Sequence, residues 1–221
     1  MTVNRSLLGA LLIAGSLVQP AAAHMVWLER GEDTVRLFFG EYAENLRERR
    51  GGHLDAIAAP QLVGSNASAS READHVAFGP LPGGDARATG QLAPWSDRAR
   101  GGRTRSVYLA REGRTDTRAV LDLELVPVRS DGDAFTLLFR GEPLRRAKVV
   151  LIGPPGWSKE LQTDAEGHVT LPTPWAGRYV AEVQHVDPTA GGQEAVAYDR
   201  TSYVSTLSFT VQDGIPWTAQ R

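Results

Sequence analysis

The chain has 221 residues, and its 26 acidic and 24 basic side chains leave a formal net charge of −2. This balance gives no electrostatic argument for nucleic-acid binding, which favours a strongly basic surface. The sequence has no cysteine, so disulfides, thiol catalysis, zinc–thiolate sites and iron–sulfur clusters are excluded. A metal ion could be held only by histidine, carboxylate, the amino terminus or methionine.

Residues 1–23 have the pattern of a secretory signal peptide. An apolar run over residues 7–18 follows a basic residue, and the small residues Ala21 and Ala23 fit a signal-peptidase site. The run is shorter than the roughly 20 residues that cross a bilayer, so we predict no transmembrane helix in the mature chain. We therefore expect export to the periplasm and a mature protein that begins at His24.

A terminal histidine would offer two nitrogen ligands on one residue. The α-amine has a reference pKa of about 7.7–8.0, so a metal ion can displace its proton near neutral pH. The imidazole of the same residue is close enough to bind the same ion. His24 is therefore the first candidate metal ligand, with the alternative that it is an ordinary first residue left by a cleavage site.

Residues 24–132 are predicted to form an N-terminal β-domain. Two short strands, over residues 24–28 and 34–39, open this part of the chain. Residues 41–50 (EYAENLRERR) contain helix formers and precede a Gly-Gly pair, which predicts one short helix. After weaker strand patterns, residues 117–128 alternate apolar and acidic side chains, as a half-buried strand does.

Residues 133–212 carry the clearest strand pattern, and residues 213–221 are predicted to be a tail. Turn signals recur about every 8–12 residues, which is typical of an antiparallel sandwich. The expected strands cover residues 134–140, 147–152, 160–163, 168–171, 178–186 and 203–211. A polar turn over residues 129–133 marks the predicted domain boundary. The predicted fold class is all-β, with two antiparallel β-sandwich-like domains and one short helix in the first.

Several short motifs stand out in the second predicted domain. They are Gly141-Glu142-Pro143-Leu144, Ala147-Lys148-Val149, Thr163-Asp164-Ala165-Glu166-Gly167 and Gly177-Arg178-Tyr179. Together they resemble the transthyretin-like and carboxypeptidase-regulatory β-sandwich, in which similar motifs bracket the first strands. This resemblance implies an architecture and, by itself, no particular activity.

Further motifs extend the resemblance to nearly the whole chain after the predicted signal peptide. They are Trp27-Leu28-Glu29 after His24, Phe39-Gly40-Glu41, residues 171–179 (LPTPWAGRY), His185-Val186-Asp187 and residues 203–209 (YVSTLSF). Together they resemble a family of exported bacterial proteins of unassigned function, described as periplasmic components of nickel or cobalt uptake. The resemblance implies two β-domains and a role that involves a divalent metal ion. The expected partners are therefore the metal ion and a membrane uptake component.

His185 is the predicted partner of His24, because two histidines could form an arrangement like the histidine brace of exported copper proteins. It lies at the end of a predicted strand, on the face that carries small and apolar residues. Asp187, two residues further on, could fix the second ring nitrogen of His185. The alternative is a histidine at the edge of the core that donates to a carbonyl or to Asp187.

Glu41 and His53 are weaker candidates for the same site. Glu41 lies at the start of the predicted helix, where it could bind a metal or simply stabilise the helix dipole. His53 follows two glycines and is either a ligand or a solvated side chain. The other histidines, His75 and His168, are expected on the surface. No two histidines have a metal-binding spacing, so any site must be assembled by the tertiary structure.

The sequence lacks the signatures of common catalytic sites, such as a nucleophile elbow or a phosphate-binding loop, and we predict that the protein is not an enzyme. The predicted function is a periplasmic accessory protein of nickel or cobalt uptake that binds a divalent metal. The resemblance favours nickel or cobalt, while copper and zinc suit the same ligands. The alternative is a structural or adhesive β-sandwich module of the cell envelope without metal, and a third hypothesis is a copper oxidase.

Overall fold

The computed structural model describes residues 24–80, 83–154 and 156–217, so the predicted signal peptide lies outside the described residues. The described chain is all-β, which confirms the predicted fold class. Apart from strands it contains two short 3-10 turns, η1 (His53–Ala56) and η2 (Glu194–Val196). Within these residues, no helix has the length and apolar character needed to cross a membrane.

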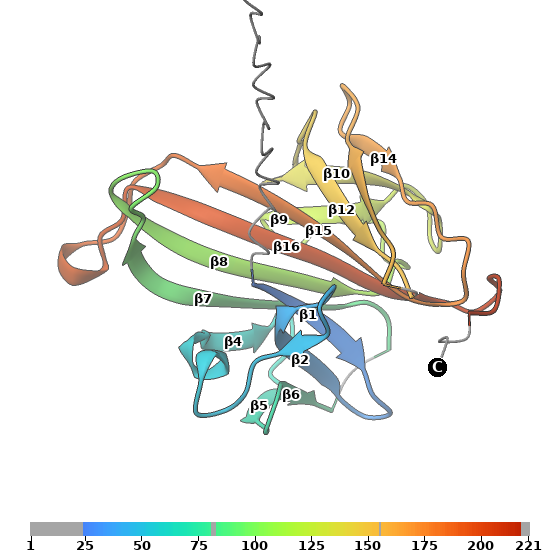
Figure 1. Cartoon of the computed structure of the whole chain (residues 1–221), viewed down its shortest axis with the longest axis horizontal. Helices are drawn as coiled ribbons and strands as arrows, with labels where there is room; N and C mark the ends of the chain where they lie inside the picture. The colour runs from blue at the N-terminus through green and yellow to red at the C-terminus, as the bar shows by residue number, and fades with distance from the viewer. Residues whose placement is uncertain (1–23, 81–82, 155, 218–221) are drawn as a thin grey trace, which may run out of the picture.

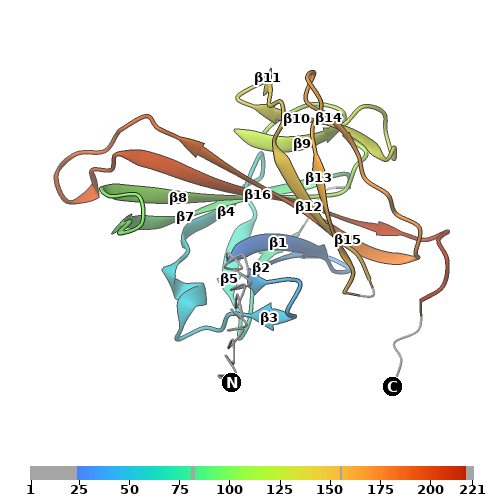
Figure 2. The ribbon, with the colours of Figure 1, turned by 45° about the horizontal axis from the view of Figure 1, so that its top comes forward.

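The strands form three sheets, of which the largest lies in the middle (Figure 1, Figure 2). In spatial order this central sheet contains β13 (Ser158–Gln162), β12 (Lys148–Ile152), β15 (Gly177–Asp187), β16 (Arg200–Val211), β8 (Arg103–Glu112), β7 (Ala86–Ser96) and β4 (Ala58–Leu62). Its neighbouring strands pair antiparallel, except that β16 and β8 run parallel.

A smaller outer sheet lies on each side of the central sheet. The N-terminal outer sheet has the order β1 (Met25–Arg30), β2 (Val35–Glu41), β6 (Val76–Gly79) and β5 (Ser68–Arg71), and β3 (Leu46–Arg47) also pairs with β2. The second outer sheet has the order β11 (Glu142–Pro143), β10 (Ala134–Phe139) and β14 (His168–Thr170), and β9 (Leu123–Pro127) also pairs with β10.

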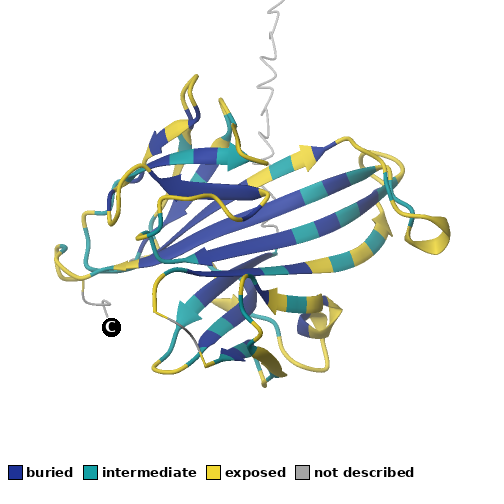
Figure 3. Cartoon of the chain, turned by 180° about the vertical axis from the view of Figure 1, so that it is seen from behind, coloured by how far each residue is buried: buried dark blue, intermediate teal, exposed yellow. Residues whose placement is uncertain are grey.

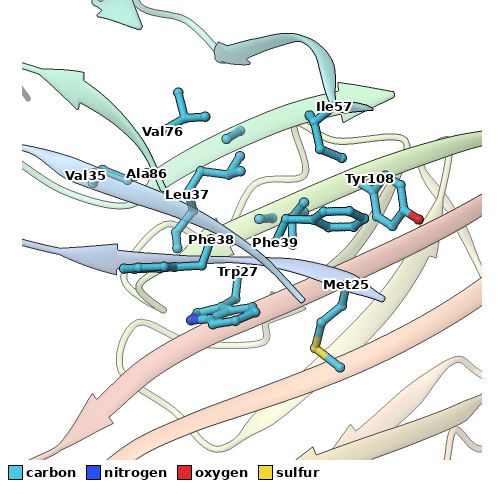
Figure 4. Packing of buried hydrophobic residues seen from close by; sticks show 14 of the residues in the cluster. Met25, Trp27, Val35, Leu37, Phe38, Phe39, Ile57, Val76, Ala86 and Tyr108 are labelled. Atoms are coloured by element: carbon cyan, nitrogen blue, oxygen red, sulfur yellow. The ribbon is translucent and has the colours of Figure 1, made fainter. Parts of the chain in front are cut away.

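Two hydrophobic cores separate the three layers. Successive side chains of a strand point to opposite faces, so β12, β15, β16 and β8 each contribute buried residues to both cores. The middle of the central sheet is accordingly buried (Figure 3). On β15, Val180 packs in the core beneath the N-terminal outer sheet, whereas Tyr179 and Ala181 pack in the core beneath the second. Figure 4 shows the first of these cores, with Trp27 and Phe38 stacked at 5.4 Å between ring centroids.

Hydroxyl groups on β16 connect the three layers. Thr206 and Ser208 each donate a hydrogen bond of 2.7 Å to a β1 carbonyl, those of Val26 and Leu28. From the opposite face of β16, Ser205 donates a 2.6 Å bond to the carbonyl of Leu123 in β9. Because β1 and β9 are edge strands of their sheets, these hydroxyls satisfy carbonyls that would otherwise be buried without a partner.

The predicted division into two domains does not match the sheet arrangement. The predicted boundary at residue 132 falls in the hairpin between β9 and β10. Strand β16, from the predicted second domain, pairs along its length with β8 from the predicted first domain. One central sheet therefore belongs to both predicted domains. The parallel β8–β16 pair joins residues that are 96 positions apart in the sequence, a contact that no local sequence pattern indicates.

The predicted helix over residues 41–50 is wrong. β2 ends at Glu41, and after a turn β3 pairs back on β2. Gly40 has a φ of +149°, and a Cβ there would lie 2.2 Å from the carbonyl oxygen of Leu46. Tyr42 packs edge-on against Trp27, with 5.4 Å between ring centroids. These tertiary contacts outweigh the helix propensity of the segment, which is a weak local preference.

Candidate functional site

Both ring nitrogens of His24 face carboxylates. Nε2 lies 2.6 Å from Glu48 Oε1, and Nδ1 lies 3.6 Å from Glu41 Oε1. All three side chains are half-buried, with 32% of His24, 20% of Glu41 and 16% of Glu48 exposed. The site is thus open enough for an ion to enter and sheltered enough for charge–charge contacts to be stronger than on an open surface.

The hairpin of β2 and β3 brings the two carboxylates to His24. Met25 pairs with Gly40 in the β1–β2 register, so Glu41 lies across from His24. Glu48 follows β3 directly, and its backbone N–H donates a 2.8 Å hydrogen bond to the carbonyl of Phe39. The turn that replaces the predicted helix is therefore the element that places Glu48 on the imidazole. Sequence reasoning missed Glu48 because it assigned this segment to a helix.

His53 adds a second imidazole to this group. It opens η1, and its ring centroid lies 6.0 Å from that of His24. We refer to His24, Glu41, Glu48 and His53 as the His24 cluster. Three of its four members are residues that the sequence analysis proposes as ligands. Within the described ranges, no three His, Asp or Glu side chains lie close enough together to hold a metal ion as they stand. The members of the His24 cluster are therefore neighbouring donor groups that would have to move closer to bind one ion.

A pocket of about 420 Å³ opens beside the His24 cluster. Its polar lining consists of His24, His53 and Ser106, and its apolar lining consists of Phe39, Ala56, Leu92, Trp95 and Tyr108. The pocket therefore lies between the start of the N-terminal outer sheet, η1, and strands β7 and β8 of the central sheet. Its volume falls in the range of small-molecule sites, which are concave and mostly apolar with a few polar groups.

Aromatic rings form much of the pocket wall. Phe39 and Tyr108 meet edge to face with 5.3 Å between ring centroids (Figure 4). Burial and, to a smaller extent, the nearby Glu182 carboxylate raise the pKa of Tyr108 to about 12. Tyr108 is thus a neutral phenol at physiological pH. Trp95, 45% exposed, donates a 3.2 Å hydrogen bond from Nε1 to Ser106 Oγ.

The structure does not bring His185 or Asp187 to His24. His185 lies on the β15 face that packs beneath the second outer sheet, where its ring centroid is 4.4 Å from that of Phe139. β1, which follows His24, covers the opposite face of the central sheet. Asp187 instead forms a 3.0 Å ion pair with Arg140 and accepts a hydrogen bond from the Thr189 backbone. The predicted alternation of β15 is correct, since His185 shares a face with Tyr179, Ala181 and Val183. That face, however, packs in the core beneath the second outer sheet and not in the core beneath β1.

No known family model matches the chain, and no curated protein shows significant sequence similarity to it. The resemblances to a metal-uptake family and to transthyretin-like sandwiches therefore stay predictions.

Protonation of His185 is expected to destabilise the fold. Burial lowers the pKa of His185, the charge of Arg140 lowers it further, and Asp187 raises it in part. The pKa of His185 in the folded state lies below its value of about 6.5 in the unfolded state. As the pH falls through about 6.5, the unfolded state therefore binds more protons than the folded state does, and unfolding is favoured. The stability of the wild type should therefore decrease from pH 7 to pH 5.

A His185→Phe variant should show a smaller decrease, measured as the urea midpoint at each pH. His168→Gln serves as control, because His168 is 52% exposed on β14 and should leave the pH dependence unchanged. Equal pH dependence in wild type and His185→Phe would contradict the prediction. Hydrogen bonds with Thr189 are the main cause of the lowered pKa of Asp187. The stability that Asp187 contributes is therefore lost only near or below about pH 4, outside the range from pH 7 to pH 5.

Proposed function

We propose that the chain is an exported, non-enzymatic protein that binds a divalent transition-metal ion, nickel or cobalt in the first place, at the His24 cluster. The metal is its cargo, for delivery to a membrane uptake component. The observation that carries the proposal is the His24 imidazole held between two carboxylates, with a second imidazole beside it. Imidazole and carboxylate are ligands that nickel, cobalt, copper and zinc all accept.

The spacing of the strongest pair suits a metal ion after a small adjustment. Two ligand atoms about 2.1 Å from one ion lie about 3 Å apart when the bonds form a right angle. His24 Nε2 and Glu48 Oε1 are 2.6 Å apart, so an ion that displaces the shared proton needs only a slight separation of the two side chains. Metal binding at this pair should therefore compete with protons and weaken as the pH falls.

The α-amine of His24 is a further donor if the signal peptide is cleaved after Ala23. It would add a nitrogen on the same residue as the imidazole, which favours chelation. The contribution of this amine is separable from that of the side chains, because an extra N-terminal glycine moves the amine and leaves the cluster intact.

Removal of the His24 imidazole should weaken binding of Ni²⁺ by at least about 10–100-fold, because loss of a residue that only hydrogen-bonds a ligand already costs this much, and here a ligand itself is lost. The measurement is isothermal titration of protein that begins at residue 24 with Ni²⁺, Co²⁺, Cu²⁺ and Zn²⁺, for the wild type and His24→Ala. Glu48→Gln should shift affinity in the same direction. His168→Ala is the matched control, since His168 is exposed beside an aspartate and outside the cluster.

Equal affinity of wild type and His24→Ala would contradict the proposal. It would leave His24 and Glu48 as an ordinary ion pair of a structural envelope module, the alternative function. If His24→Ala weakens binding while the glycine extension does not, the side chain binds the metal and the amine does not.

A further inference from the structure

The pocket beside the His24 cluster is larger and more apolar than a bare metal ion requires. One water molecule occupies about 30 Å³ in the liquid, so a pocket of about 420 Å³ exceeds the needs of an ion with a few waters. Two cluster members, His24 and His53, also line the pocket. A molecule in the pocket would therefore contact the proposed metal ligands directly.

The cluster also offers few donors that already lie together. Transition-metal ions take four to six ligands in protein sites. Of the cluster members, only Glu48 lies within hydrogen-bond distance of the His24 ring, whereas Glu41 is 3.6 Å away and the His53 ring centroid lies 6.0 Å from that of His24. Ligand positions therefore remain for donor atoms from another molecule, and the pocket provides the space next to them.

We propose that the pocket holds the organic part of a metal chelate, a small planar heteroaromatic ligand whose metal ion is bound by His24 and Glu48. This inference rests on the proposed function, since it specifies the form in which the metal arrives. The rings of Phe39, Trp95 and Tyr108 provide apolar walls against which a flat ring can stack or meet edge to face.

The polar atoms of the pocket suit such a ligand. Ser106 accepts a hydrogen bond from Trp95, and among the described residues its own hydroxyl proton is given to no other group. A hydroxyl can donate one bond while it accepts another, so Ser106 can donate to a carboxylate of the chelator. The two carboxylates of the cluster repel a free organic anion, but they attract its one-to-one complex with a divalent ion, because a chelator of charge −1 then carries a net charge of +1.

Picolinate and glycinate provide a matched pair of probes. Both chelate Ni²⁺ through one nitrogen and one carboxylate oxygen, but only picolinate carries a planar ring. Equimolar Ni²⁺–picolinate should bind the wild-type protein about tenfold more tightly than equimolar Ni²⁺–glycinate, because only its ring gains the aromatic contacts. Picolinate alone should show no measurable binding. Titration calorimetry gives the affinities, and Trp95 provides a fluorescence signal from the pocket wall.

Two variants test the pocket without altering the cluster. Trp95→Ala removes part of the aromatic wall at an exposed position, and Ala56→Trp fills the pocket from η1, where Ala56 is also exposed. In both variants, the preference for picolinate over glycinate should disappear while affinity for Ni²⁺ alone stays unchanged. His24→Ala should weaken binding of every nickel species.

Each contrary result has a distinct meaning. Equal affinity for the two chelates in the wild type, with Ni²⁺ still bound through His24, would overturn the chelate inference and leave the proposed function standing. Binding of picolinate alone, unaffected by His24→Ala, would also overturn it, because the pocket would then be a site for the free organic anion. No binding of any nickel species would overturn the proposed function itself.

Discussion

Replacement of Arg111 with methionine should lower the free energy of unfolding by about 3–5 kcal/mol, because it removes the ion-pair partner of buried Asp85 and one of the two arginines that face buried Glu124. Arg111 lies in the central strand β8 and is fully buried. Its guanidinium donates to Glu124 at 2.9 Å, to Asp85 at 2.5 Å and to the carbonyl of Gly113 at 3.1 Å. Both acidic side chains are almost completely buried.

The carboxylate of Glu124 is the centre of this ion network. It also accepts a 2.7 Å hydrogen bond from Arg87 Nε and bonds of 2.6 and 2.8 Å from the backbone N–H groups of Val120 and Leu121. The loss of Arg111 therefore affects β8, β7 and the loop before β9 together. A buried ion pair adds little net stability compared with an apolar substitute, but removal of only one partner is costly.

Equilibrium unfolding in urea measures the effect. Arg118→Met is the control, because Arg118 is 85% exposed and its ion pair is with Asp116 at the surface, so its loss should cost less than about 1 kcal/mol. The double variant Arg111→Met with Glu124→Gln should be destabilised by less than the sum of the two single changes, since the Arg111–Glu124 contact is lost in each of them and is counted twice in the sum. Similar stabilities of Arg111→Met and Arg118→Met would contradict the prediction.

The same ion network explains why the strand predicted over residues 117–128 is shorter in the structure. Residues 117–128 alternate as a half-buried strand would, but β9 covers only Leu123–Pro127. Residues before it form a loop around the Glu124 carboxylate, and this depends on arginines from β7 and β8 that local periodicity does not reveal. The all-β fold class and most strands of the C-terminal half were predictable, because apolar and polar residues alternate along these strands as their buried and exposed faces do. The shared central sheet was not, because it depends on the distant β8–β16 pairing.

The candidate site was predictable in part for a similar reason. His24, Glu41 and His53 were singled out by their chemistry and position in the chain, and the structure brings these three side chains together. His185 was selected by the apolar face of its strand, but a strand between two cores has an apolar face on each side. Glu48 lies in a segment with strong helix propensity, and only the contacts of the β2–β3 hairpin place it beside His24.

Loss of the hydroxyls of Thr206 and Ser208 should loosen the strand that follows His24. The double variant Thr206→Val with Ser208→Ala should lower the free energy of unfolding by about 2–5 kcal/mol, because each change leaves a buried β1 carbonyl without its donor. Valine has nearly the shape of threonine, so at residue 206 the effect is that of the hydrogen bond and little of the packing.

Thr210→Val is the matched control, because it makes the same chemical change at an exposed position of β16. It should change stability by less than about 0.5 kcal/mol. Hydrogen exchange of the β1 amides should be faster in the double variant than in the Thr210→Val protein. Since β1 positions His24 against Glu48, metal affinity should fall in the double variant even though no ligand has been altered. Unchanged exchange in β1 would mean that its pairing with β2 alone fixes the strand, and that the β16 hydroxyls do not support the site.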